Sequence, residues 1–239
     1  MFLETKEIVR SDFQIELGSQ LGDAVYSLIC EINTLLSNWQ TYRSLFGSEP
    51  ERFKLLFDIG GGGMVSLESS LWDTVILKLC KLTEPRKDSK GNNVLSLRVL
   101  PASFPDPIDR EKLNEKEKLQ TKVCRQIKKD IKNAEKVVEP LRKVRHLRIA
   151  HRNLDVVSGD FDLKENSRQQ IQNSIDAVCQ PIITLYAGLL DVQLDMAPVG
   201  SSKGALTLLN TLYDGHCRDT CEGDSRGRPN WLCYGKWDN

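Results

Sequence analysis

The chain has 239 residues, 40% of them hydrophobic, so it is long enough to bury the core of one large domain or two small ones. Lysine plus arginine and aspartate plus glutamate both number 33, so net charge says nothing about a polyanionic partner, and an argument for nucleic-acid binding must rest on local clusters of charge. The first residues lack the apolar centre of a signal peptide, and no apolar run reaches the roughly 20 residues of a membrane span. A cytoplasmic protein without a membrane partner is therefore expected.

Apolar residues at helical spacing predict a long amphipathic helix over residues 13–46, and the Gly-Ser-Glu-Pro sequence at 47–50 predicts its end and the start of a second helix. The second helix extends to Leu82 and contains four consecutive glycines at 60–63. Each helical glycine costs roughly 1 kcal/mol relative to alanine, so the run predicts a kink or a close-packing point. A phosphate-binding loop is the alternative, but the Gly-Lys-Ser/Thr ending is absent because Met64 follows the run.

Proline, glycine and polar residues predict a loop from Pro85 to about Asp109, with a short helix at 94–100 inside it. A third helix is expected over residues 109–139, and lysine and arginine outnumber acidic residues about two to one between positions 111 and 152. This surplus predicts a basic strip. Pro140 should bend or restart the helix because proline cannot donate the interior hydrogen bond.

A fourth helix is expected over residues 163–194, with a possible kink at Pro181, and a short helix over 205–212 precedes a polar, glycine-rich tail. No stretch alternates with the period of a strand. The sequence thus predicts an all-α fold, divided into a helical domain at 1–195 and a C-terminal short helix with irregular tail at 196–239.

The seven cysteines fall into two groups. Four lie within helical patterns, far apart in the sequence, and are expected to be buried thiols: Cys30, Cys80, Cys124 and Cys179. The tail contains four residues of the types that ligate zinc, namely His216, Cys217, Cys221 and Cys233, but their spacing lacks a second close Cys pair. Accessible thiols are the default interpretation of the tail and structural zinc is the alternative, so no metal site is predicted.

The richest chemistry lies at residues 142–153, where four arginines, one lysine and two of the three histidines follow the basic helical segment. Histidine suits proton transfer because its ordinary pKa is near 6.5, and arginine suits phosphate because its planar fork binds two oxygens and stays charged. This composition is what metal-free RNA cleavage through a 2′-hydroxyl requires, and such chemistry needs no cofactor. The alternative is a solvated basic helix end whose histidine is favoured by the helix dipole.

The stretch resembles the Arg-(Asn/Asp/His)-x4-6-His signature of the HEPN superfamily, with Arg145 and His146 followed by His151. Three further segments are similar to its bacterial abortive-infection branch, the AbiU-like proteins, and the resemblance spans roughly residues 15–215: Ser70-Leu71-Trp72-Asp73 leading into Leu79-Cys80-Lys81-Leu82-Thr83-Glu84-Pro85, then Asn93-Val94-Leu95-Ser96-Leu97-Arg98, and Arg148-Ile149-Ala150-His151-Arg152-Asn153.

The resemblance implies a HEPN-like four- to five-helix bundle with long helices and a small C-terminal extension. It further implies a homodimer whose two chains contribute arginine and histidine to one cleft, ribonuclease or toxin activity in phage defence, and RNA as the ligand. An antitoxin or a nucleotidyltransferase is a possible partner. In some members the nucleotidyltransferase modifies a tyrosine two positions after the histidine, where this chain has Asn153 instead.

We assign proton transfer to His151 and phosphate stabilisation to Arg145 as catalytic residues. Six positions at about 100° each place the two roughly 120° apart around one α-helix, which favours a site completed by a second copy. Arg148, three positions before His151, should share its face. Four residues are expected to bind substrate: His146, Arg148, Arg152 and Asn153. The alternative function is a noncatalytic HEPN-like module that binds RNA or protein through the same surface.

Overall fold

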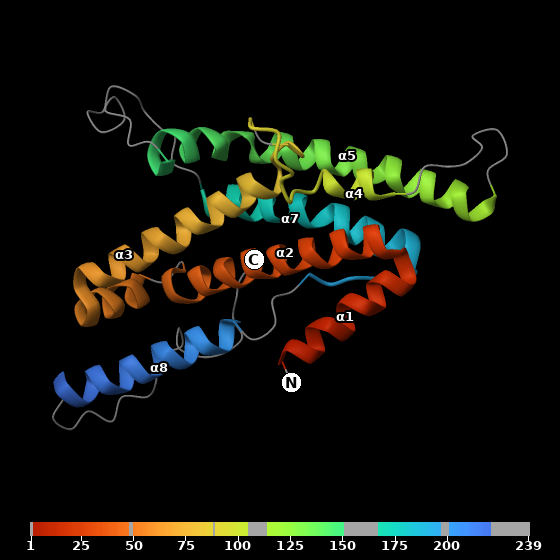
Figure 1. Cartoon of the computed structure of the whole chain (residues 1–239). Helices are drawn as coiled ribbons and strands as arrows, with labels where there is room; N and C mark the ends of the chain where they lie inside the picture. The colour runs from red at the N-terminus through yellow and green to blue at the C-terminus, as the bar shows by residue number, and fades with distance from the viewer. Residues whose placement is uncertain are drawn as a thin grey trace. The chain divides into compact units, whose positions relative to one another are not determined.

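The computed structural model describes residues 2–47, 50–87, 89–104, 114–150, 167–196 and 201–220. In these ranges the secondary structure is helical and no strand occurs, with a single isolated bridge between Lys87 and Asn93. The predicted all-α, HEPN-like bundle is confirmed, with long helices as its main elements (Figure 1). None of the helices in the described part is long and apolar enough to cross a membrane.

The described chain divides into two compact units. The first comprises residues 1–34 and 76–196, and the second comprises residues 35–75 and 197–239. Two long helices contribute to both units, so neither unit is a continuous stretch of sequence. The division predicted at residue 195 stays a prediction.

The first unit begins with α1 (Phe2–Leu17) and the start of α2 (Ser19–Phe46). The single helix predicted over 13–46 is wrong, because Gly18 adopts a positive φ of 83° and separates the two helices. A Cβ on Gly22 would lie 2.5 Å from the carbonyl oxygen of Phe13, so only glycine permits this close approach. The ion pair between Arg10 and Asp23, 2.7 Å long, joins α1 to α2 across the turn.

The second helix predicted from Pro50 is confirmed as α3 (Pro50–Leu82). The glycine run is a kink, because Gly61 has φ 49° and ψ −132° within the helix. The last turns of α3, from Ile76 onward, belong to the first unit. The chain then passes through an irregular segment whose backbone folds back on the helix end, since the Leu97 amide donates to the Leu82 carbonyl over 2.8 Å. A short helix, α4 (Val99–Ser103), follows, later than the predicted 94–100.

Helix α5 (Glu115–Val144) starts later and ends later than the predicted 109–139. Asn114 caps it, accepting from the Glu117 amide over 2.8 Å while the Glu117 carboxylate accepts from the Asn114 amide over 2.8 Å. Pro140 lies inside the helix without ending it. The helix continues into a π-helical turn, η1 (Arg145–Ala150), whose wider i→i+5 bonding replaces the α pattern directly after Val144.

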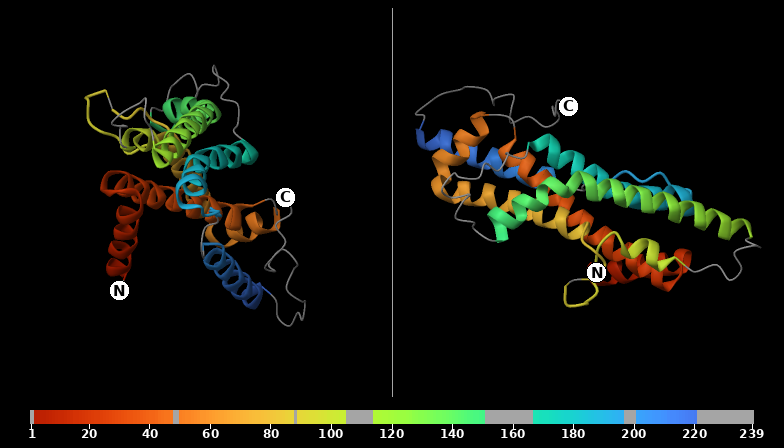
Figure 2. Two further views of the ribbon diagram at one scale, coloured as in Figure 1. Left: turned by 90° about the vertical axis from the view of Figure 1, so that its right-hand side faces the viewer. Right: turned by 90° about the horizontal axis from the view of Figure 1, so that it is seen from above.

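Helix α7 (Arg168–Leu185) packs along α5, as the views in Figures 1 and 2 show. Pro181 is accommodated in the helix, and a second π-helical turn, η2 (Tyr186–Leu190), follows in place of the predicted continuation to 194. Thr184 donates to Asp130 over 2.6 Å and so fixes α7 against α5. The core of the first unit is aliphatic and comes mainly from α2, α3, α5 and α7: Val25, Leu28, Ile32, Ile76, Leu79, Ile127, Ile131, Val138, Leu141, Ile175, Val178 and Ile182.

The second unit contains residues 35–46 of α2, residues 50–75 of α3, and α8 (Ser201–Thr220), which is longer than the predicted 205–212. Aromatic rings join its first two segments, since the Tyr42 and Trp72 ring centroids lie 5.1 Å apart, and within α2 Trp39 stacks on Tyr42 at 5.5 Å. Tyr42 also donates to the Glu68 carboxylate over 3.3 Å. Leu206 and Leu209 are the buried large side chains of α8.

Two of the four helical cysteines are fully buried as predicted, Cys80 and Cys179. Cys124 is half-buried, and Cys30 is exposed, so the prediction of a buried thiol is wrong for Cys30. In the tail, His216 and Cys217 lie on the backbone of α8, while Cys221 and Cys233 lie outside the described residues. Within the described residues no group of His, Cys, Asp or Glu side chains is arranged to hold a metal ion.

Candidate functional site

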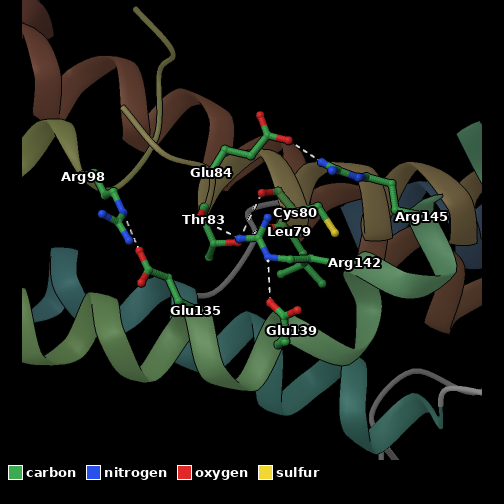
Figure 3. Close-up of polar contacts among 9 residues, drawn as sticks. All are labelled: Leu79, Cys80, Thr83, Glu84, Arg98, Glu135, Glu139, Arg142 and Arg145. Atoms are coloured by element: carbon green, nitrogen blue, oxygen red, sulfur yellow. Dashed lines mark hydrogen bonds and ion pairs between the residues drawn. The ribbon is translucent and has the colours of Figure 1, made fainter. Parts of the chain in front are cut away.

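The C-terminal end of α5 lies against the C-terminal end of α3, and Arg142 fastens the two together (Figure 3). Its Nη2 donates to both the carbonyl oxygen and the Oγ1 of Thr83, each over 2.7 Å. Its Nε also lies 3.3 Å from the Glu139 carboxylate, one turn earlier on α5. A guanidinium at a helix C-terminus satisfies carbonyls that lack an intrahelical partner and opposes the negative end of the helix dipole. Arg142 is therefore a cap for α3.

The cap rests on a buried hydroxyl. Thr83 is 2% exposed, and its Oγ1 donates to the Leu79 carbonyl over 3.0 Å while accepting from Arg142. The helix end, the threonine and the arginine thus form one connected hydrogen-bond network. Because each member is satisfied by the others, the residue that follows Thr83 is held in a defined place beside α5.

That following residue is Glu84, and its Oε1 accepts a hydrogen bond from Nη1 of Arg145 (Figure 3). Both side chains are 30% exposed, so the ion pair lies at the surface of the first unit with one side open to solvent. Arg145 stands at the junction of α5 and η1, where its backbone amide donates to the carbonyls of Arg142 and Leu141. The predicted phosphate-binding arginine is therefore already paired with a carboxylate of its own chain.

Charge surrounds the buried thiol of Cys80 beneath this pair. Burial raises the pKa of the thiol to about 11, with a further rise from the carboxylates of Glu84 and Glu139. The guanidinium groups of Arg145 and Arg142 act in the opposite direction and are outweighed. Cys80 consequently stays a neutral thiol near neutral pH, and it supports the site as part of the core.

The π-helical turn changes the geometry on which the sequence argument relied. Angles of about 100° per residue apply to an α-helix, whereas residues 145–150 follow the wider turn in which residue i pairs with residue i+5. The expected 120° separation of Arg145 and His151, and the shared face of Arg148 and His151, therefore cannot be derived from α-helical spacing. Insertions of this kind occur frequently at functional sites.

The remaining predicted site residues separate into three groups. His146 is described and exposed on η1. Arg148 is described for its backbone alone, within η1. His151, Arg152 and Asn153 lie outside the described residues. Their assignment as proton-transfer and substrate-binding residues stays a prediction, and Arg145 is the catalytic candidate whose surroundings are known.

Sequence reasoning missed the partners of Arg145 and Arg142. Glu84 and Thr83 lie about 60 positions earlier, and only the segment Leu79-Cys80-Lys81-Leu82-Thr83-Glu84-Pro85 signalled them, as part of the resemblance. The local signal is a hydroxylated and a charged residue directly before a proline, which together indicate a helix end. The last carbonyls of a helix need donors from elsewhere in the chain, and here Arg142 supplies one.

A comparable ion pair involves α5 about two turns before Arg142. Arg98, just before α4, pairs with Glu135 of α5 over 2.6 Å, and Figure 3 shows Glu135 on the same helix as Arg142 and the pair apart from Arg145. Both pairs join an arginine to a glutamate across elements of the first unit. This makes the Arg98–Glu135 pair a matched reference for substitutions at Arg145 and Glu84.

A family model described as AbiU2, of the HEPN type, matches residues 19–201 of the chain. The match includes α3, α5 and η1, and so contains both arginines of the cluster and the segment that carries Thr83 and Glu84. No curated protein and no solved structure matches the chain.

Proposed function

The chain belongs to the AbiU2 family of abortive-infection HEPN proteins, and from this premise we propose that it is an endoribonuclease that cleaves RNA without a metal ion. The observation that carries the proposal is Arg145, held at the surface of the first unit at the start of the HEPN signature with its guanidinium partly open to solvent. The planar fork of an arginine in that position can bind two oxygens of one phosphate, and it stays charged.

The proposed reaction begins when a base removes the proton of an RNA 2′-hydroxyl. The 2′-oxygen then attacks the adjacent phosphorus, and the 5′-oxygen of the next nucleotide leaves with a proton from an acid. His151 carries the proton transfers because imidazole exchanges a proton near neutral pH. Arg145 stabilises the extra negative charge on the phosphorane oxygens, a role that favours a permanently charged group.

Two copies of the chain supply the acid and the base together in this proposal. One imidazole cannot hold the proton it has removed and deliver a different one to the leaving oxygen at the same moment, so a pair of His151 side chains completes the site. A twofold homodimer brings such a pair together by symmetry. His146, Arg148, Arg152 and Asn153 bind the RNA around the scissile phosphate.

Glu84 competes with the RNA phosphate for Arg145. The ion pair leaves part of the guanidinium's five-donor capacity for a second ligand, so the phosphate can share the arginine or displace the carboxylate. A partly exposed ion pair contributes only about 0.2–1 kcal/mol, so displacement is within reach of phosphate binding.

The test is cleavage of a labelled RNA pool in EDTA by the wild-type protein and by His151→Ala and Arg145→Ala. The matched control is Arg98→Ala, which also removes the arginine of an arginine–glutamate pair. The proposal expects cleavage by the wild type and by the control and a loss of 100-fold or more in both site variants, because His151→Ala removes a general acid or base and Arg145→Ala removes the stabiliser of the phosphorane charge. Wild-type protein that leaves RNA intact as a confirmed dimer contradicts it.

The ion pair between Arg145 and Glu84 supports a second candidate function, a noncatalytic HEPN-like module that binds RNA or a protein partner. In that case His151→Ala would bind as tightly as the wild type, while Arg145→Ala and Arg148→Ala would bind more weakly. Growth of cells that express each variant separates the two functions, because a toxin loses its effect with His151→Ala and a binding module retains it.

A further inference from the structure

Most of the exposed basic residues of α5 lie on one face of the helix. At about 100° per residue, seven of the nine fall within about 80° of the helix circumference. One of the seven, Lys118, pairs with Glu115 over 2.7 Å, and the other six extend over about 32 Å of the helix length. All six are exposed to solvent. We call this set the α5 stripe: Lys122, Arg125, Lys129, Lys132, Lys136 and Lys143.

The stripe lies opposite the buried face of the same helix. The core positions Ile127, Ile131, Ala134, Val138 and Leu141 centre about 180° from it by the same angular count. Since those core positions carry the packing on the rest of the first unit, including α7, the stripe faces away from the unit's interior. From Lys122 to Lys136 its neighbours are three or four positions apart, about 5–6 Å between Cβ atoms, and Lys143 follows two turns later.

The acidic residues of the same stretch do not neutralise the stripe. Asp130 accepts hydrogen bonds from Thr184 and Gln126, Glu135 pairs with Arg98, and Glu139 pairs with Arg142. Within the described residues none of the six stripe cations lies in an ion pair. The positive charge of α5 is therefore concentrated on one face, although the chain as a whole is neutral.

The residue types of α5 narrow the ligand further. From Glu115 to Val144 the helix contains no aromatic residue, so it offers bases no stacking surface. Proteins that hold single strands combine a basic groove with stacked aromatics, whereas double-helical RNA is recognised through its shape and its backbone. A straight row of cations without aromatics suits the second ligand.

We propose that the α5 stripe binds the phosphate backbone of a double-helical segment of RNA. The proposal rests on the proposed function in taking RNA as the substrate, and it adds the class of RNA: one with a duplex arm held along α5, whose adjoining strand reaches Arg145 at the end of the same helix. The stripe contributes affinity that is independent of base sequence, because phosphate contacts carry no sequence information.

The test measures binding of a fluorescent 20-base-pair RNA duplex, and of one of its single strands, to the full-length protein over a range of salt concentrations. The test variant is Lys129→Gln/Lys132→Gln/Lys136→Gln. The control, Lys54→Gln/Lys87→Gln/Lys116→Gln, removes the same charge from exposed lysines outside the stripe. Each lost phosphate contact lowers the slope of log affinity against log salt by about 0.7–0.9, so the test variant should lose about 2–3 of that slope and the control little.

The outcomes of this test decide the proposal. Weaker duplex binding by the test variant than by the control, with the wild type preferring duplex to single strand, supports it. Equal binding by the two variants, or tighter binding of the single strand, overturns it, and capture of an acidic peptide in place of RNA does so too. A wild-type protein that binds duplex through the stripe but cleaves no RNA overturns the endoribonuclease and leaves the stripe intact.

Discussion

Replacing Glu84 with glutamine should strengthen RNA binding at Arg145. The substitution keeps the size of the side chain and removes the negative charge that Arg145 now faces. Both partners are 30% exposed, so the ion pair is screened by solvent and contributes about 0.2–1 kcal/mol. If RNA phosphate must overcome that contact, its removal improves the affinity by about 1.4- to 5-fold, since 1.4 kcal/mol corresponds to a factor of ten.

The assay is fluorescence anisotropy with a short RNA, using His151→Ala as the background so that the ligand is not cut. Glu135→Gln is the control, because it breaks the Arg98 pair and leaves Arg145 unchanged. The Arg145→Ala background should abolish the gain, since Glu84 then has no arginine to release. If Glu84→Gln weakens binding more than Glu135→Gln does, the carboxylate orients the arginine and the competition argument is refuted.

Three further predictions concern stability and are measured by urea denaturation. Arg142→Ala should lower the free energy of unfolding by about 1–3 kcal/mol, because the carbonyl and hydroxyl of buried Thr83 lose their charged donor. The control Lys143→Ala, at the exposed neighbouring position, should change it by less than about 0.5 kcal/mol, and equal effects of the two substitutions would contradict the capping role. Gly22→Ala should lower the free energy of unfolding by about 1–3 kcal/mol, because its Cβ would lie 2.5 Å from the Phe13 carbonyl oxygen. The control Gly204→Ala, at a position of α8 with no atom near the added Cβ, should raise it, and a Gly22→Ala variant as stable as the wild type would refute the close approach. Burial raises the pKa of the Cys80 thiol to about 11 and that of Cys179 to about 12, so as pH rises the native state keeps these protons after the unfolded chain has lost them. The free energy of unfolding should therefore fall as pH rises above about 9. The decline should be shallower in Cys80→Ala/Cys179→Ala, and an unchanged slope in that variant would contradict the prediction.

The helical architecture was predictable because the apolar spacing is long and regular. Residues such as Leu28, Ile32, Ile127 and Ile131 recur at helical intervals and are all buried. The breaks were harder to place. Gly18 lies within an apolar pattern that continues on both sides, and its role depends on the contact between Gly22 and Phe13, which no local pattern specifies.

Two prolines lie inside long helices. A restart of the helix was expected as one alternative at Pro140 and a kink as a possibility at Pro181, and α5 and α7 continue through both prolines, so no restart occurs at Pro140. Tertiary packing outweighs the loss of one hydrogen bond where the neighbouring positions are buried, as Val138 and Leu141 are around Pro140. The π-helical turn that begins five residues after Pro140 had no signal in the sequence.

The sequence predicted the arginine of the candidate site but not the carboxylate that pairs with it. Arginine and histidine chemistry identified Arg145 and the residues after it, because those side chains are rare in such density. The carboxylate opposite Arg145 depends on the packing of α5 against the end of α3, and contacts between residues about 60 positions apart cannot be derived from spacing along one helix.

Cleavage of RNA in EDTA by the wild-type protein beside His151→Ala tests the central claim most directly. The account predicts defined cleavage products from the wild type, ending in a cyclic or 3′-phosphate as 2′-hydroxyl attack requires, and their loss in the variant. Equal cleavage by the two proteins, or intact RNA with both, would contradict it.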